Sequence, residues 1–211
     1  MPYLVLPSHH LYFQVETAAT DRPWLVFCNS LGTDLSMWDP QVENLARYFR
    51  ILRYDRRGHG LSTAPNTPFT LDDLGNDLLR LLDALGIERT HFCGLSIGGL
   101  VGQWLGINAA TRINKIVVAA TAPKIGIAEA WRERVDLVRS QGLKALVPGT
   151  RERWFSPEFA AIAPITVSHF LTVFEATSLN AYVGCCIVLA DADLRDQIAQ
   201  IGLLPVSWTP S

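Results

Sequence analysis

The segment of this sequence with the clearest potential for chemistry is a serine between two glycines. Gly94-Leu95-Ser96-Ile97-Gly98 follows the apolar run His91–Cys93 and leads into a stretch with helical spacing, Ile97–Ala109. A serine on a tight turn between a strand and a helix is held in a strained conformation that exposes its hydroxyl, and glycines two residues away relieve the clashes. We therefore predict that Ser96 is a nucleophile. The alternative is that Ser96 only caps the helix in a glycine-rich turn.

A serine nucleophile that attacks a carbonyl also needs two backbone N–H groups that hold the resulting oxyanion. Ile97 begins the expected helix, so its N–H points toward the site with the positive end of the helix behind it. The second donor normally lies in the loop after an earlier strand, and Asn29-Ser30-Leu31-Gly32 directly follows Trp24–Cys28. We expect the N–H of Leu31 to be this donor, with Ser30 as the neighbouring alternative. The competing interpretation is an ordinary turn.

Strands that alternate with helices must position these residues. Apolar runs predict strands at Tyr3–Leu6, Leu11–Val15, Trp24–Cys28, Arg50–Tyr54, His91–Cys93 and Lys115–Ala120. Helical spacing predicts helices at about residues 40–49, at Leu71–Leu85 and at Ile97–Ala109. This alternation is typical of an α/β fold with a mostly parallel sheet.

From Pro123 onward the alternation stops and the pattern becomes helical. Helices are predicted around Trp131–Val138 and over Gln141–Phe155, Ile165–Ser178 and Asn180–Ile201, with no further strand. This pattern favours a helical insertion after an α/β core. We divide the chain into a core at residues 1–122, a helical lid at 123–190 and a segment at 191–211 that returns toward the core.

The composition is that of a folded globular protein. The chain has 211 residues, 49% of them hydrophobic, and a net charge of −2 from 18 basic and 20 acidic residues. Without an excess of cations, nucleic acid is not expected as a partner. The apolar stretches fall far short of the roughly 20 residues that span a membrane, and the first residues lack the features of a signal peptide. We therefore expect no membrane partner and a cytoplasmic location.

The cysteines indicate neither a metal site nor a disulfide. Cys28, Cys93, Cys185 and Cys186 include no CxxC pair, and the adjacent pair does not suit a zinc site. Cys28 and Cys93 each end a short apolar run. We expect free, buried thiols in a reducing compartment.

Several longer segments resemble a known family. GLSIGG at 94–99 and DRRGHGLS at Asp55–Ser62 resemble the α/β-hydrolase fold, and the closer resemblance is to the 3-oxoadipate enol-lactonases. That resemblance covers residues 3–201 and is carried by FCNSLGTDLSMWDPQ at Phe27–Gln41, LRYDRRGHGLS at Leu52–Ser62, HFCGLSIGGLVGQWLGINA at His91–Ala109, ERWFSP at Glu152–Pro157, AYVGCC at Ala181–Cys186 and ADLRDQI at Ala192–Ile198.

The resemblance implies hydrolysis of 3-oxoadipate enol-lactone to 3-oxoadipate, in the β-ketoadipate pathway that degrades aromatic compounds through protocatechuate or catechol. It implies serine acyl-enzyme chemistry on a small lactone without metal or cofactor, beneath a helical lid. This lactone carries a carboxylate, so a cation near the site is expected. Lys124, Arg132 and Arg134 are candidates by location, with solvated surface as the alternative. Trp131 beside them is a substrate-binding candidate or a core residue.

The resemblance ends near residue 201. In this fold the triad residues follow the chain order serine, acid, histidine, yet no acidic residue follows Asp196 and no histidine follows His169. We expect His59 in the RGHG turn to be structural and the remaining histidines to lie away from Ser96. The acid and the histidine of the triad are thus not found, and we expect a fold truncated and divergent after about residue 201, without its last strands and helices.

Two rival hypotheses remain beside the lactonase. One is another small ester or lactone hydrolase on the same fold, because the fold does not determine the substrate. The other is an inactive remnant, truncated or frameshifted, which keeps binding without catalysis. The sequence carries no signal for the oligomeric state.

Overall fold

A mostly parallel β-sheet forms the centre of the molecule. The computed structural model describes residues 2–17, 19–65, 67–202 and the backbone of 206–208. Within these ranges the sheet has seven strands in the order β1-β2-β4-β3-β5-β6-β7. The strands are β1 Tyr3–Val5, β2 His10–Glu16, β3 Trp24–Cys28, β4 Arg50–Tyr54, β5 Thr90–Leu95, β6 Ile113–Ala119 and β7 Val206–Trp208. Strand β2 pairs antiparallel with both β1 and β4, and β3 to β7 run parallel. The predicted α/β fold is confirmed.

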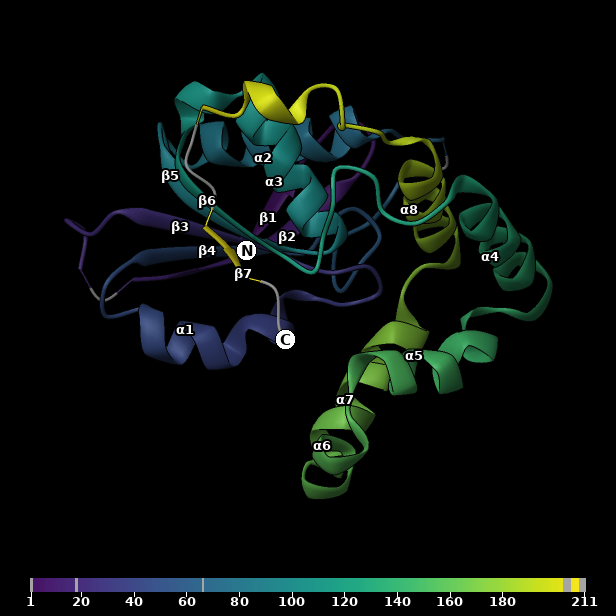
Figure 1. Cartoon of the computed structure of the whole chain (residues 1–211). Coiled ribbons are helices and arrows are strands. Elements are labelled where there is room, and N and C mark those ends of the chain that lie inside the picture. The colour runs from purple at the N-terminus through teal and green to yellow at the C-terminus, as the bar shows by residue number, and fades with distance from the viewer. Residues whose placement is uncertain (1, 18, 66, 203–205, 209–211) are drawn as a thin grey trace.

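Helices cover both faces of the sheet and one side of it. They are α1 Asp39–Leu45, α2 Leu71–Ala84, α3 Ile97–Asn108, α4 Ala128–Gln141, α5 Val147–Trp154, α6 Pro157–Ile162, α7 Pro164–Ala176 and α8 Leu179–Asp191. Figure 1 shows α2 and α3 on one face, α1 on the other, and α4 to α8 as a separate helical group beside the sheet. In the view of Figure 1, α6 lies at the lower end of that group, away from the sheet.

The two central strands β3 and β4 match their predicted bounds. Both Trp24–Cys28 and Arg50–Tyr54 are strands from end to end, with Val26 and Leu52 fully buried. No single helix of the described residues is long and apolar enough to cross a membrane, and α7 with α8 meets that criterion only as a pair bent by 91°.

The second half of the chain differs from its predicted pattern in several places. The α-helix predicted over Gln141–Phe155 begins only at Val147, and α6 was not predicted. The expectation of no further strand is wrong, because Val206–Trp208 pairs in parallel with β6. Three residues are too few to show a strand period in the sequence. The predicted helix Asn180–Ile201 ends early, at Asp191, where the chain turns back and Leu194 N–H donates to the Pro123 carbonyl at 2.9 Å. Of the predicted divergent end, residues 203–205 and 209–211 lie outside the described residues.

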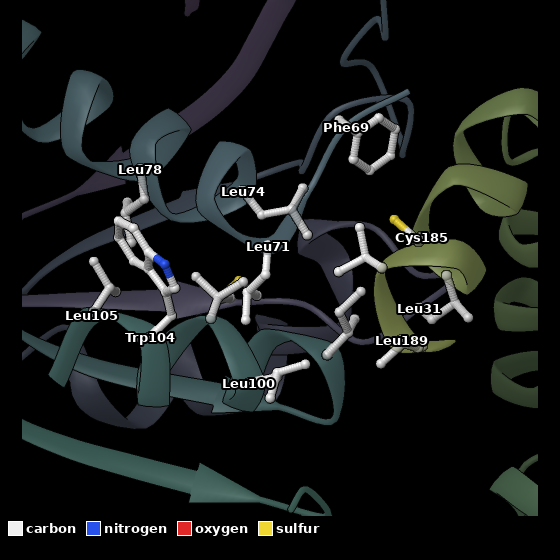
Figure 2. Packing of buried hydrophobic residues seen from close by; sticks show 14 of the residues in the cluster. Leu31, Phe69, Leu71, Leu74, Leu78, Leu100, Trp104, Leu105, Cys185 and Leu189 are labelled. Atoms are coloured by element: carbon white, nitrogen blue, oxygen red, sulfur yellow. The ribbon is translucent and has the colours of Figure 1, made fainter. Parts of the chain in front are cut away.

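One apolar cluster joins α2, α3 and α8. Figure 2 shows Leu78 of α2 beside Trp104 of α3, while Leu74 points toward the side of the cluster where Phe69 and Cys185 lie. From α8, Cys185 and Leu189 extend the same cluster toward Leu31, in the loop after β3 (Figure 2). Burial of each such leucine contributes about 1.5–3 kcal/mol, so the last helix and the β3 loop are held to the core by the same packing.

The cysteines are all free, and Cys28, Cys185 and Cys186 are buried. Burial raises the pKa of Cys93 to about 11 and that of Cys186 to about 12. Burial likewise raises the pKa of Cys28 and Cys185. These thiols therefore stay protonated near neutral pH and behave as small apolar side chains.

The RGHG turn after β4 is held by buried polar groups. Asp55 accepts hydrogen bonds from the N–H groups of Leu35 at 2.7 Å and Leu61 at 2.9 Å. Arg57 donates two bonds of 2.7 Å to Asp77 on α2. His59 is fully buried, and its Nδ1 lies 3.2 Å from the Arg57 carbonyl oxygen. These contacts support the structural role predicted for His59.

His59 makes the fold sensitive to acid. Burial lowers the pKa of His59 from 6.5 to about 3, so between these values the unfolded chain binds more protons than the native one. This group therefore stabilises the fold above pH 6.5, and that contribution is lost as the pH falls toward 3, by up to about 1.4 kcal/mol per pH unit. His59→Asn removes the titration, so its free energy of unfolding should fall less steeply with acid than that of the wild type.

Urea unfolding followed by circular dichroism at stepwise pH values between 7 and 4 measures the difference. Burial raises the pKa of Asp55 to about 6, but Asp55 titrates in both proteins and cancels in the comparison. Parallel stability curves for the two proteins would contradict the assignment.

Candidate active site

Ser96 occupies a sharp turn between β5 and α3. Its φ of 56° and ψ of −119° lie in a region that residues other than glycine avoid. Two backbone bonds hold the turn, from Ser96 N–H to the Ala119 carbonyl at 2.9 Å and from Leu100 N–H to the Ser96 carbonyl at 3.0 Å. The Ser96 side chain makes no capping bond to α3, so the helix-cap alternative is wrong. The strained turn leaves the hydroxyl available to a cavity.

The two flanking glycines are required by close backbone contacts. A Cβ at Gly94 would lie 2.3 Å from the Gly98 carbonyl oxygen, and a Cβ at Gly98 would lie 2.2 Å from the Cys28 carbonyl oxygen. Backbone atoms of a packed sheet cannot retreat as a flexible side chain can. The turn can therefore approach the end of β3 only with glycine at both positions.

The loop after β3 is held from several sides. Asn29 donates to the Tyr54 carbonyl at 3.1 Å and accepts from the Trp38 indole N–H at 2.9 Å. Arg56, which is almost fully buried, donates to the Ser30 carbonyl at 2.7 Å. These polar contacts determine where the backbone of the loop lies relative to Ser96.

The N–H groups of the loop differ in what they contact. The Ser30 N–H points at the sulfur of Met37, 3.4 Å away. By contrast, the N–H groups of Leu31 and Ile97 donate to no acceptor among the described residues. Both Leu31 and Ser96 line the same cavity. The geometry therefore favours Leu31 over Ser30 as the partner of Ile97.

Ser96 lies where two cavities meet. The first, the apolar chamber, has a volume of about 460 Å³ and is lined by Ser30, Thr33, Met37, Leu95, Ser96, Ala120, Arg153, Trp154, Phe155 and Phe170. The second, the cationic chamber, has a volume of about 340 Å³ and is lined by Ser30, Leu31, Ser96, Ile125, Trp131, Arg134, Arg153, Trp154, Phe174 and Tyr182. Ser96 comes from the turn after β5. Helices α4, α5, α7 and α8 supply part of the remaining walls, and the loops after β3, β6 and α5 supply much of the rest.

Two guanidinium groups face the cationic chamber. Arg134 donates to the Tyr182 hydroxyl at 3.1 Å and lies over the Trp131 ring, 5.4 Å from its centre. Among the described residues neither Arg134 nor Arg153 pairs with a carboxylate. Desolvation and the nearby charge of Arg134 lower the pKa of Arg153. Two neighbouring positive charges repel each other, and a bound anion would reduce that repulsion. The two arginines therefore favour the binding of an anion.

The structure separates the basic candidates that the sequence grouped together. Arg134 and Trp131 line the cationic chamber. Lys124 instead donates to the Ala190 carbonyl at 3.1 Å, and Arg132 pairs with Asp191 at 3.1 Å on the surface. Because both contacts are with the end of α8, Lys124 and Arg132 are not substrate-binding candidates.

Two residues of the site escaped the sequence analysis. Arg153 on α5 borders both chambers, and Tyr182 on α8 holds Arg134. Burial raises the pKa of Tyr182 to about 12, so its hydroxyl stays neutral. The only available signal was their presence in the segments ERWFSP and AYVGCC, whose positions relative to Ser96 depend on helix packing.

No general base contacts Ser96 in the described part of the chain. His9 bonds to Asp77 at 3.1 Å, His59 is enclosed, and His91 packs its ring on Phe49. His169 on α7 lies 3.2 Å from the Ser36 hydroxyl. Within the described ranges, no three His, Cys, Asp or Glu side chains are grouped to hold a metal ion.

Comparison with known proteins agrees with this geometry. Residues 23–154 match the family model described as alpha/beta hydrolase fold. The chain is 45% identical to 3-oxoadipate enol-lactonase 2 of Acinetobacter baylyi over 183 residues, which are 87% of this chain and 68% of that protein. The crystal structure of the enol-lactonase from Burkholderia xenovorans LB400 superposes with a TM-score of 0.94 at 39% identity, covering 98% of this chain and 80% of the other. A hydrolase from Pseudomonas aeruginosa PA01 gives a TM-score of 0.92 at 40% identity, covering 97% and 78%.

The close contact at Gly98 predicts a large loss of stability on Gly98→Ala. The added methyl would overlap the Cys28 carbonyl, so we expect a destabilisation of about 1–3 kcal/mol, measured by urea unfolding. Gly149→Ala in α5 is the matched control, because no other part of the described chain lies within 4 Å of the position that its methyl group would take. Equal stability of the Gly98→Ala and Gly149→Ala proteins would contradict this account of the turn.

Proposed function

The chain belongs to the α/β-hydrolase family and, within it, to the 3-oxoadipate enol-lactonases, and on that basis we propose that it hydrolyses 3-oxoadipate enol-lactone to 3-oxoadipate with Ser96 as nucleophile. One observation carries the choice of substrate. The cavity at Ser96 presents Arg134 and Arg153 without a carboxylate partner among the described residues, and this lactone brings a carboxylate.

The geometry supports an acyl-enzyme route. The Ser96 hydroxyl oxygen bonds to the lactone carbonyl carbon, and the N–H groups of Leu31 and Ile97 hold the oxyanion. The ring C–O bond then breaks and releases an enolate, which takes up a proton and becomes the ketone of 3-oxoadipate. Water hydrolyses the acyl-enzyme and restores the serine. The proton of Ser96 must pass to a base, and the described residues place none against it.

Recognition of the carboxylate follows from the cationic chamber. Arg134 is oriented from two sides, by the Tyr182 hydroxyl and by the face of Trp131. Arg153 faces the chamber from another helix, so the two guanidinium groups can approach one carboxylate from different directions. Helices α4 to α8 would act as the lid that keeps water from the bound lactone. The reaction would then belong to aromatic degradation, in the cytoplasm that the composition predicts.

A second candidate is a protein that binds such carboxylates without hydrolysing esters. The absence of an imidazole at Ser96 within the described residues favours it. A reactivity test in which the base is added from solution bears on this choice. It measures whether the Ser96 hydroxyl can act as a nucleophile once a base is present.

We expect free imidazole to activate Ser96. Without an adjacent base the hydroxyl stays protonated, so a fluorophosphonate probe should label the 211-residue chain scarcely faster than a Ser96→Ala control. Added imidazole should raise the labelling rate of the wild type by roughly tenfold or more, a part of the 10²–10⁴-fold that a positioned base contributes. Gel fluorescence measures both rates.

The Ser96→Ala control tests whether Ser96 is the residue that reacts with the probe. If imidazole raised labelling of Ser96→Ala equally, Ser96 would not be the reacting group. Rapid labelling of the wild type in the absence of imidazole would mean that the chain itself supplies a base.

The cationic chamber predicts which arginines bind the product. Arg153→Gln and Arg134→Gln should each weaken binding of 3-oxoadipate by roughly tenfold or more, because each removes a charged hydrogen-bond donor. Isothermal titration calorimetry measures the dissociation constants. Arg132→Gln is the matched control, since Arg132 pairs with Asp191 outside both chambers. Equal losses for all three variants would mean that only net charge matters.

A further inference from the structure

The apolar chamber is larger than the proposed lactone needs. In the proposed function, a six-carbon lactone would place its reacting carbonyl at Ser96 and its carboxylate at Arg134 and Arg153, and all three residues line the cationic chamber of about 340 Å³. The apolar chamber adds about 460 Å³ on the other side of Ser96. The two chambers share Ser30, Ser96, Arg153 and Trp154 as lining residues, so they adjoin at Ser96.

The walls of the apolar chamber suit an aliphatic or aromatic group. Met37, Leu95, Phe155 and Phe170 line it, and each is partly exposed rather than buried in the core. Water against these surfaces is unfavourable, by roughly 25 cal/mol for each Å² that a ligand could cover. The chamber therefore gains free energy from an apolar occupant.

Contacts within the protein hold the walls of the apolar chamber. The Met37 sulfur is held by the Ser30 N–H at 3.4 Å and by the Thr33 hydroxyl at 3.1 Å. On the opposite wall, Phe155 packs against Phe170 with ring centres 6.2 Å apart. Ordering these side chains around an occupant would cost little, which preserves the free energy of its burial for binding.

We propose that the apolar chamber binds the aliphatic or aromatic part of esters and lactones that also carry a carboxylate. This inference rests on the proposed function and extends it to a wider class of substrate. Arg153 carries the argument, because it borders both chambers and can hold a carboxylate while the attached chain enters the apolar side. The occupant is thus a monoanion with an apolar tail.

A series of simple carboxylates tests the proposal without requiring catalysis. Butanoate, hexanoate, octanoate and decanoate are titrated into the 211-residue protein by calorimetry, below their micelle concentrations. Each added methylene should tighten binding by about two- to fourfold until the chamber is filled. A dissociation constant that does not change with chain length would overturn the proposal.

Substitutions in the apolar chamber test whether the alkyl chain binds there. Phe170→Ala should flatten the dependence of binding on chain length, and Met37→Gln, which keeps the side-chain volume but is polar, should do the same. Leu171→Ala is the matched control, because Leu171 is the next residue of α7 and lines a different cavity. An unchanged dependence on chain length in both Phe170→Ala and Met37→Gln would also overturn the proposal.

Arg153→Gln separates this inference from the proposed function. Weaker binding of every carboxylate by a similar factor supports both, since Arg153 would hold the head group of each. Binding that tightens with chain length but is equally strong in Arg153→Gln would support the apolar chamber. The same result would contradict the carboxylate site of the proposed function. If Arg153→Gln weakened binding of short carboxylates and longer chains bound no more tightly, the carboxylate site would be supported and the apolar chamber contradicted.

Discussion

The strained backbone of Ser96 is the constraint on which the rest of the site depends. A φ of 56° is costly for a serine and persists only because surrounding backbone holds it. The Ala119 carbonyl binds its N–H, and the glycine at 98 lets the turn lie against the Cys28 carbonyl. Strands β3, β5 and β6 must therefore be adjacent and parallel before the hydroxyl can be presented at their common edge.

The same edge is stabilised by buried charges rather than by apolar packing alone. Arg56 holds the Ser30 carbonyl, and Arg57 holds Asp77 on α2. A buried ion pair stabilises little in net terms, but loss of one partner is costly, by about 3–5 kcal/mol. Such contacts act here as positioning devices, because each ties a loop at the site to another element of the fold. The conformation of the loop after β3, which carries the Leu31 N–H, thus depends on contacts with residues distant in sequence.

The two chambers at Ser96 differ in charge, because Arg153 borders both of them and Arg134 borders only the cationic chamber. In the cationic chamber, desolvation and the nearby charge of Arg134 lower the pKa of Arg153, and a bound anion would offset both effects. The apolar chamber offers methionine, leucine and phenylalanine surface. A ligand that satisfies both must combine a carboxylate with an apolar group, and its carbonyl would lie between the two, at Ser96. Charge and apolar surface together therefore select orientation as well as class.

Local pattern was sufficient for β1 to β6 and for the turn at Ser96, but not for β7. A short apolar run such as Trp24–Cys28 is typical of a buried strand. Glycines two residues before and after Ser96 are typical of a sharp turn between a strand and a helix. The partners of Arg134 could not be predicted in the same way, because Arg153 and Tyr182 reach it from α5 and α8. Lys124 and Arg132 looked equivalent to Arg134 along the chain and instead contact the end of α8. The physical reason is that a helix can turn any of its faces toward the sheet, and only packing against other helices settles which side chains reach the serine.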